Sequence, residues 1–288
     1  MLDFFLTPFS EFEFMRRALV GGMALALSGA PVGVFLILRR MSLTGDAMAH
    51  AILPGAALGY LFSGLSLGAM TTGGFAAGLV VAVASGAVAR ATSLREDASL
   101  AAFYLMSLAL GVTIVSLKGT SIDLLHVLFG NVLALDDATL ILLAAISSLT
   151  LLGLAALYRS LVMETVDPNF LASVSRAGGP TQIAFLVLVV MNLVAGFQAL
   201  GTLLAVGLMM LPAAAARLWT TDVTRMIGVA ALIGVLSVYI GLIASFESGA
   251  PSGPMIILVA GVFYILSVAF GRSGGLTRGM GSRRHLEA

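Results

Sequence analysis

Residues 181–198 read TQIAFLVLVVMNLVAGFQ, a run that contains no charged side chain. A helix of about 20 such residues is long enough to cross the roughly 30 Å hydrocarbon core of a bilayer. Comparable apolar runs recur along the whole chain, which is 59% hydrophobic and 10% charged. Soluble proteins carry about 25% charged residues. The sequence therefore predicts a polytopic membrane protein rather than an unusually hydrophobic soluble one.

The apolar runs predict an all-α transmembrane helical bundle of about eight to nine spans. The candidate crossings are approximately 17–38, 47–63, 68–89, 98–117, 139–158, 181–198, 200–218, 226–245 and 254–271. Glycine and proline mark several of the breaks, such as SGLSLG at 63–68 and SGAPSGP at 248–254. We expect residues 1–271 to form one transmembrane domain, because the tail 272–288 is too short to bury a core.

The arginines predict the orientation of the chain, because cytoplasmic loops are rich in Lys and Arg. If the loop at 159–180 is cytoplasmic, alternation of the crossings places most basic residues on that side. These residues are Arg39, Arg40, Arg90, Arg95, Arg159, Arg176, Arg217, Arg225, Arg272, Arg278, Arg283 and Arg284. Only Arg16, Arg17 and Lys118 fall on the other side. We therefore expect a multi-pass protein of the cell (inner) membrane with its N-terminus outside and its C-terminus inside.

Several function classes are excluded by what the sequence lacks. Cysteine is absent, so there are no disulfides and no thiolate metal ligands. The only lysine, Lys118, follows Leu117 rather than the glycine of a P-loop, so the chain has no ATPase site of that type. A net charge of +1 gives no sign of nucleic-acid binding. The acidic, aromatic N-terminus predicts no cleavable signal peptide. Active transport would therefore draw its energy from another subunit or from an ion gradient.

An acid and a histidine share one face of a predicted helix in GDAMAHAILPG, residues 45–55. Asp46 and His50 are four residues apart, which places their side chains about 6 Å from each other on a helix. Measured from Arg39 and Arg40 at the interface, His50 lies about ten residues inward, on the order of 15 Å. Ionisable groups at that depth are costly and usually face a protein interior or a water-filled path.

A structural role is the alternative for each of these two residues. Asp46 follows Gly45 at the start of a crossing, where a carboxylate can cap the helix. His50 can bond to a neighbouring backbone carbonyl. Zinc hydrolysis of the HExxH type is not predicted, because no second histidine stands at the required spacing from His50.

A second pair occurs in SIDLLHVLFGN, residues 121–131, where Asp123 and His126 are three residues apart. This segment is too apolar for a plain loop and too short to span, so we expect a re-entrant or interfacial helix. A structural role is an equal alternative for this pair. Carboxylate and imidazole together form a ligand set for Zn²⁺, Mn²⁺ or Fe²⁺. The two pairs are therefore candidate metal ligands.

The most organised hydrophilic segment is METVDPNFLASVSRAGGP, residues 163–180. Asp167 before Pro168 is typical of an N-cap followed by the first helical residue, and Gly178 is typical of a helix end. About three turns of helix lie between them. The apolar residues on one side of this helix are Phe170, Leu171 and Val174. The segment predicts either a helix that docks on a cytoplasmic partner or an amphipathic helix that lies on the membrane.

Five stretches of the chain, taken in order, resemble the membrane permease subunits of ATP-binding-cassette importers for zinc, manganese and iron(II). They are RRMSLTGDAMAHAILPGAALGY (39–60), REDASLAAFYLMSLALGV (95–112), DLLHVLFGNVLAL (123–135), ALGTLLAVGLMMLPAAAARL (199–218) and IGLIASFESGAPSGPMIIL (240–258). Each stretch alone is modest, but their order and spacing are specific. The chain departs from the family at Ala49, where a serine usually precedes the histidine.

The resemblance implies a homodimer of permeases with two cytoplasmic ATPase subunits and an extracytoplasmic metal-binding protein that delivers the ion. It implies no permanently bound cofactor, the divalent metal ion being the transported substrate. The helix at 167–178 would be the coupling helix seated in the ATPase. The residues that carry the ion would be Asp46, His50, Asp123 and His126.

Other classes stay open at the level of the sequence. A proton-coupled secondary metal transporter would show inverted repeats, which we do not find. A permease for metal chelates would need no paired ionisable ligands along its path. An intramembrane hydrolase lacks a recognisable nucleophile. The ligand types do not choose among zinc, manganese and iron, because these ions share ligands.

Overall fold

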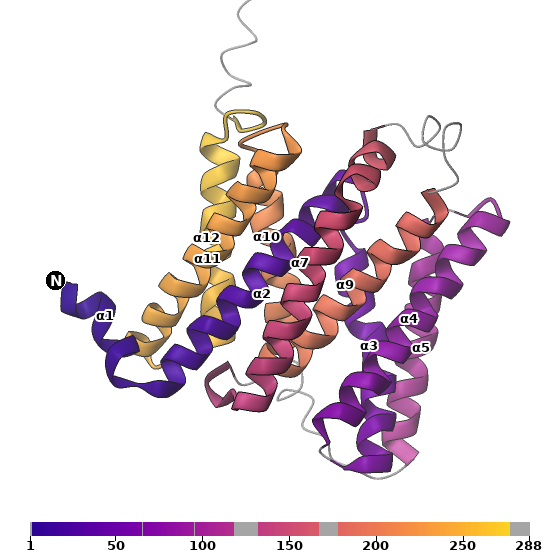
Figure 1. Cartoon of the computed structure of the whole chain (residues 1–288), viewed down its shortest axis with the longest axis horizontal. Coiled ribbons are helices and arrows are strands. Elements are labelled where there is room, and N and C mark those ends of the chain that lie inside the picture. The colour runs from indigo at the N-terminus through magenta and orange to yellow at the C-terminus, as the bar shows by residue number, and fades with distance from the viewer. Residues whose placement is uncertain (1, 65, 95, 118–131, 167–177, 277–288) are drawn as a thin grey trace, which may run out of the picture.

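The computed structural model describes residues 2–64, 66–94, 96–117, 132–166 and 178–276 (Figure 1). Its elements are α1 (Leu2–Glu11), α2 (Glu13–Leu38), α3 (Thr44–Ser63), α4 (Leu67–Ala91), α5 (Glu96–Leu117), the short 3₁₀ helix η1 (Val132–Ala134), α7 (Asp137–Val166), α9 (Gly178–Leu200), α10 (Thr202–Arg217), α11 (Val223–Ser248) and α12 (Ser252–Phe270). No β-strand occurs within these described ranges. The predicted all-α helical fold is confirmed.

Each predicted crossing coincides with one helix between α2 and α12. The helices long and apolar enough to cross a membrane number 7 and are α2, α4, α5, α7, α9, α11 and α12. The other two differ from them in length or polarity: α10 has only 16 residues, whereas α3 has 20 residues but a lower mean hydropathy. A multi-pass membrane protein is therefore established, and the count of eight to nine spans stays a prediction.

Local sequence sets both ends of α11. Asp222 precedes α11, and its carboxylate accepts a hydrogen bond from the Arg225 N–H at 2.8 Å, as an N-cap should. Gly249 follows the same helix with φ of 68° and ψ of 10°, a left-handed conformation that glycine adopts without steric cost. These ends divide the apolar runs into separate helices.

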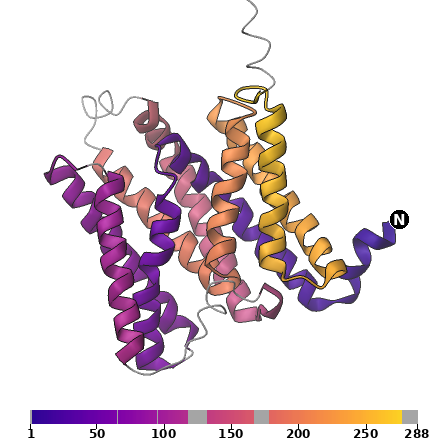
Figure 2. The same ribbon diagram turned by 180° about the vertical axis from the view of Figure 1, so that it is seen from behind.

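The helices run alternately in opposite directions and form one elongated bundle (Figures 1 and 2). α2, α7 and α9 occupy the middle, with α10, α11 and α12 on one side and α3, α4 and α5 on the other. The most apolar window of α2 is 72% buried and that of α9 is 67% buried, whereas the corresponding values for α5, α7 and α12 are 22%. The central pair α2 and α9 therefore forms the core, and the outer helices leave apolar surface for lipid or a partner.

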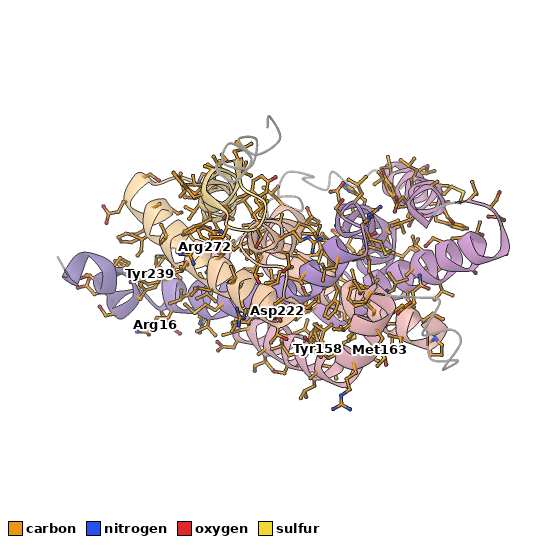
Figure 3. All side chains as sticks on the ribbon, turned by 90° about the horizontal axis from the view of Figure 1, so that it is seen from above. Arg16, Tyr158, Met163, Asp222, Tyr239 and Arg272 are labelled. Carbon is orange, nitrogen blue, oxygen red and sulfur yellow. The ribbon has the colours of Figure 1, made fainter. Side chains whose placement is uncertain are left out.

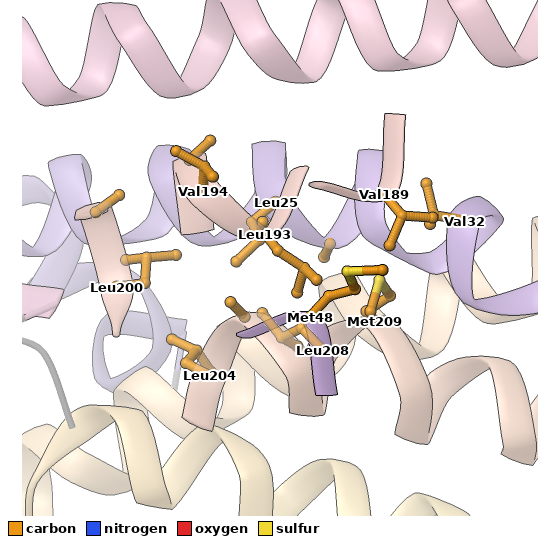
Figure 4. Close-up of a cluster of buried hydrophobic side chains, with 14 of the residues drawn as sticks. Leu25, Val32, Met48, Val189, Leu193, Val194, Leu200, Leu204, Leu208 and Met209 are labelled. Carbon is orange, nitrogen blue, oxygen red and sulfur yellow. The ribbon is translucent and has the colours of Figure 1, made fainter. Parts of the chain in front are cut away.

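The core is a contact between α2, α9 and α10, with α3 entering from one side (Figure 4). Leu25 and Leu193 are among its fully buried side chains, and Met48 of α3 lies beside Met209 of α10. Gly33 allows the closest approach, because a Cβ at that position would overlap the Met209 carbonyl oxygen. Small residues are common at helix contacts in membranes, where association depends on van der Waals packing.

Three polar side chains join α2, α7 and α9 inside this apolar core. Asn192 Nδ2 donates to Ser28 Oγ at 2.6 Å, and the hydroxyls of Ser28 and Ser147 lie 3.2 Å apart. All three residues are at most 5% exposed. Interhelical hydrogen bonds of this kind contribute about 0.6 kcal/mol each on average in membranes. The cluster therefore fixes the relative positions of the central helices more than it adds to stability.

The two ends of the bundle carry different charges. The α2–α3, α4–α5 and α10–α11 connections and the end of α12 lie at one end, which Figure 3 views from above. Among the described residues, the basic side chains at or near this end are Arg39, Arg40, Arg159, Arg217, Arg225 and Arg272. The acids Asp46, Asp97, Glu164 and Asp222 share this end with them, whereas Arg16 and Arg17 lie at the opposite end with Glu13, Asp136, Asp137 and Glu247. Arginines are therefore more numerous at the first end, as the predicted orientation requires, and the orientation itself stays a prediction.

Candidate metal-binding site

Asp46 and His50 lie in the first two turns of α3, just after a tight turn from α2. The Met41 N–H donates to the Leu36 carbonyl at 2.9 Å, and the Arg40 N–H donates to the Ile37 carbonyl at 3.1 Å. This pair of bonds is a Schellman motif, which ends α2. The motif reverses the chain, so that α3 runs back along the bundle and carries the pair inward from the arginine-rich end.

The geometry of the pair suits a divalent ion. Asp46 Oδ1 lies 3.7 Å from His50 Nε2, and the two side chains are 66% and 31% exposed in this single chain. Metal bonds to oxygen and nitrogen of about 2.0–2.2 Å each would together exceed this separation, so one ion can contact both atoms. The carboxylate would offset part of the ion's charge, and the neutral imidazole would add a nitrogen ligand without further charge.

Asp46 does not cap α3. The N-cap residue of α3 is Leu43, with no side-chain cap hydrogen bond at that position. Asp46 is the third helical residue, where its charge is favourable near the helix N-terminus. Its carboxylate therefore remains available to a ligand.

One aromatic neighbour and one unpartnered nitrogen describe the surroundings of His50. The Tyr104 ring of α5 stacks near the imidazole, with centroids 6.4 Å apart and planes at 28°. His50 Nδ1 is buried and has no hydrogen-bond partner in the part of the chain that the structure describes. Metal-binding histidines usually donate their second nitrogen to an acceptor; for a metal bound at His50 Nε2, that acceptor would come from water or from outside the described residues.

Pro54 lies one turn beyond His50 on the same helix. It has no N–H to donate to the His50 carbonyl, so α3 lacks one of its internal hydrogen bonds at this turn. The nearby Ala51 carbonyl accepts a hydrogen bond from Ser107 Oγ of α5 at 3.1 Å. Pro54 also packs against Gly111, where a Cβ would come 3.0 Å from the proline ring. Contacts from α5 therefore reach α3 at Ala51 and at the proline itself.

The other predicted site residues fall largely where the structure gives no description. Asp123 and His126 lie outside the described residues. Among the coupling residues, those outside are Asp167, Pro168, Phe170, Leu171 and Val174. Gly178 is described, and it begins α9 at the position where the sequence predicts the end of the preceding helix. Within the described ranges, no group of three or more His, Asp or Glu side chains could hold a metal.

Sequence reasoning did not find two contacts that the structure places next to predicted functional parts. Tyr104 contacts His50 from α5, and Arg39 pairs with Glu164 of α7 at 2.5 Å. The partners are 54 and 125 positions apart, so no local pattern could have joined them. The only signal for Arg39 was its place at the predicted cytoplasmic interface.

Known proteins resemble the whole chain. Residues 11–271 match the model of the ABC 3 transport family. The manganese transport system membrane protein MntC of Halalkalibacterium halodurans is 33% identical over 283 residues, which cover 96% of this chain and 94% of that protein. The manganese import system permease protein ScaB of Streptococcus parasanguinis is 30% identical over 268 residues, covering 93% and 94%. A Haemophilus influenzae membrane protein named for iron transport is 28% identical, covering 94% and 98%.

Solved structures share the fold. PsaBC from Streptococcus pneumoniae, solved in complex with Fab, matches with a TM-score of 0.84 and 27% identity, covering 97% of this chain and 100% of the matched chain. An inward-facing metal-chelate type ABC transporter matches with a TM-score of 0.67 and 15% identity, covering 91% and 89%, which shows the fold alone. The extent of the family match, the helical fold and its apolar helices agree. The chain is a multi-pass membrane permease of the ABC 3 transport family.

Proposed function

We propose that this permease moves a divalent metal ion, with Mn²⁺ as the first candidate, into the cytoplasm. The observation that carries the proposal is the Asp46–His50 pair, whose facing atoms lie 3.7 Å apart on a helix that is otherwise apolar. The printed names of the relatives, two for manganese and one for iron, support the same class of substrate. Membership in an ATP-binding-cassette family argues against the proton-coupled alternative.

The ion would be held by an incomplete ligand set. Asp46 and His50 supply one oxygen and one nitrogen, and Asp123 with His126 would form a second pair along the path. Water or a second copy of the chain would complete the coordination at each pair. A complete cage of protein ligands would retain the ion, whereas two ligands permit release. The metal is thus a substrate, and we propose no resident cofactor and no catalytic site.

A second copy of the chain is the partner that the exposure of the pair supports. An ion path through lipid must be enclosed by protein, and yet Asp46 is 66% exposed in one chain. A homodimer with the pairs facing each other would enclose it. The energy would come from a cytoplasmic ATPase dimer docked on residues 167–178, and an extracytoplasmic metal-binding protein would deliver the ion.

The test is uptake of radioactive Mn²⁺ by cells that lack their own manganese importer and express this chain with its ATPase and delivery protein. Asp46→Ala and His50→Ala should each lower uptake at least about tenfold, because even residues that only support metal ligands cost 10–100-fold when lost. Glu247→Gln is the matched control, since Glu247 is an exposed carboxylate at the other end of the bundle. Uptake in both variants equal to that of the control would refute the ligand role.

A further inference from the structure

Arg39 is the point at which three helices meet at the arginine-rich end of the bundle. It follows α2, and its side chain is only 9% exposed. Its Nη2 contacts Glu164 Oε2 of α7 at 2.5 Å, and its Cζ lies 5.0 Å from the centre of the Phe185 ring of α9. A guanidinium within about 6 Å of an aromatic face is attracted to it. One side chain therefore holds α2 to both α7 and α9.

Aromatic packing one turn deeper fixes the same three helices. Phe35 of α2 meets Phe185 of α9 and Tyr158 of α7 edge-on, with centroids 6.1 Å apart in both cases. The Tyr158 hydroxyl in turn lies 2.7 Å from Thr224 Oγ1 of α11. Tyr158 and Met163, labelled in Figure 3, mark this end of α7. The end of α2 is thus enclosed rather than free to move by itself.

The turn after Arg39 leads directly to Asp46 and His50, the first pair of proposed metal ligands. The Met41 N–H bonds to Leu36, and the Thr44 N–H bonds to the Met41 carbonyl at 3.1 Å. These hydrogen bonds restrict the backbone of the turn between the end of α2 and the start of α3. A displacement of Arg39 therefore reaches Asp46, seven residues further on, through a short and hydrogen-bonded connection.

The two contacts of Arg39 flank the segment that we propose docks on the ATPase. Glu164 lies three residues before Asp167, where that segment begins, and Phe185 lies seven residues after Gly178, where it ends. Arg39 Nε is buried without a hydrogen-bond partner among the described residues. A buried ion pair is weak evidence for stability, and its best-attested use is to set a register or a switch.

We propose that Arg39 is a positioning residue for metal transfer: it keeps the turn before Asp46 and His50 in register with the two helices that flank the ATPase-docking segment. The inference rests on the proposed function, since it assigns to the ion pair the task of linking ATP hydrolysis to movement of the metal ligands. Arg39 does not itself contact the ion.

The test measures Mn²⁺ transported per ATP hydrolysed, using the permease purified with its ATPase and reconstituted in liposomes with the delivery protein. Arg39→Gln should assemble with the ATPase and hydrolyse ATP, but transport about tenfold less Mn²⁺ per ATP, because the link between the two ends is lost. Arg159→Gln is the matched control, because Arg159 is an exposed arginine on α7. It should leave the ratio unchanged.

Two further variants separate positioning from general stability. Glu164→Gln keeps the shape of the side chain and should lower the ratio as Arg39→Gln does. The double variant should be no worse than Arg39→Gln alone, because Arg39→Gln already removes the ion pair that Glu164→Gln removes. Additive losses, or ATP hydrolysis that falls in parallel with transport, would overturn the proposal. If Arg39→Gln does not assemble with the ATPase, Glu164→Gln alone tests the proposal. An unchanged amount of Mn²⁺ transported per ATP in Glu164→Gln would then overturn it.

The same experiment distinguishes this inference from the proposed function. No Mn²⁺ uptake by the unaltered complex would contradict the proposed function, and the inference would fail with it. Uptake by the unaltered complex, lost in Asp46→Ala but unchanged per ATP in Arg39→Gln and Glu164→Gln, would contradict the inference alone.

Discussion

Arg40 has a φ of 59°, and it is the only non-glycine residue with a positive φ in the described part of the chain. It occupies the position of the Schellman motif that glycine usually fills. A left-handed conformation costs a residue with a Cβ about 1–2 kcal/mol. The α2–α3 turn that precedes Asp46 and His50 is therefore strained at this one position.

Replacement of Arg40 by glycine should stabilise the chain, because glycine adopts this conformation without the steric cost. We expect Arg40→Gly to raise the midpoint of thermal unfolding in detergent. Arg159→Gly should lower it, since glycine inside a helix costs about 1 kcal/mol relative to alanine. A decrease for Arg40→Gly like that for Arg159→Gly would show that the turn carries no strain that glycine relieves.

Asp136 lies just before α7 and outside the membrane-spanning segments. Its charged carboxylate accepts hydrogen bonds at the start of this helix. Hydrogen bonds from the Thr139 side chain and then from its backbone N–H, the latter at 3.0 Å, lower the pKa of Asp136 below its ordinary value of 3.8. Because the folded state prefers the charged form, its contribution to stability is complete above pH 3.8 and is lost as the pH falls through the lower folded-state value.

Asp136→Asn should therefore lower the unfolding midpoint near neutral pH and have a smaller effect in strong acid. Thr139→Ala should remove part of the same pH dependence, because it deletes the side-chain bond and keeps the backbone one. Thermal unfolding at about pH 7 and about pH 3 measures both. An equal effect of Asp136→Asn at the two pH values would argue against the cap.

At the scale of whole helices, the backbones of α3 and α4 approach each other closely where Gly55 meets Gly73. A Cβ on Gly55 would overlap the carbonyl oxygen of Gly73, and a Cβ on Gly73 would overlap that of Gly55. Neither neighbour is a flexible side chain that can turn away. The helix that carries Asp46 and His50 therefore depends on glycine at this crossing.

Gly55→Ala should push α3 and α4 apart and destabilise the permease by about 1–3 kcal/mol, the usual cost of overpacking. Gly261→Ala of α12 is the control, because no atom lies within 4 Å of a Cβ built there. The control should be neutral or stabilising, since alanine favours helix. The measurements are the yield of folded protein and its unfolding midpoint, and similar values for the two variants would contradict the close-packing argument.

At the scale of the whole molecule, a permease of this family is one part of an assembly, and residues 167–178 are its proposed contact with the ATPase. Phe170→Asp or Leu171→Asp should abolish co-purification of the ATPase, because a charge would replace the apolar side of the predicted helix. Ala172→Asp, on the opposite side of the same helix by its 3.6-residue period, should leave co-purification intact. Loss in all three variants would indicate general disruption instead of a docking face.

Much of the fold follows from apolar run length, because lipid requires backbone groups to bond within each segment. Runs such as 181–198 therefore become helices such as Gly178–Leu200. The i, i+4 spacing likewise places Asp46 and His50 on one face. Contacts between distant residues could not be predicted from the sequence, because helix packing decides which faces meet. No local pattern links Arg39 to Glu164 or His50 to Tyr104.

Pro54 gives α3 two mechanically different halves. With one backbone hydrogen bond missing at the turn after His50, the helix has a natural hinge there. The half that bears Asp46 and His50 is joined through the α2–α3 turn to the arginine-rich end of the bundle, whereas the other half packs closely on α4 through Gly55. Bending at this point would tilt Asp46 and His50 relative to the second half of α3 while that half stays in place, so the bend axis lies one turn from the two proposed ligands.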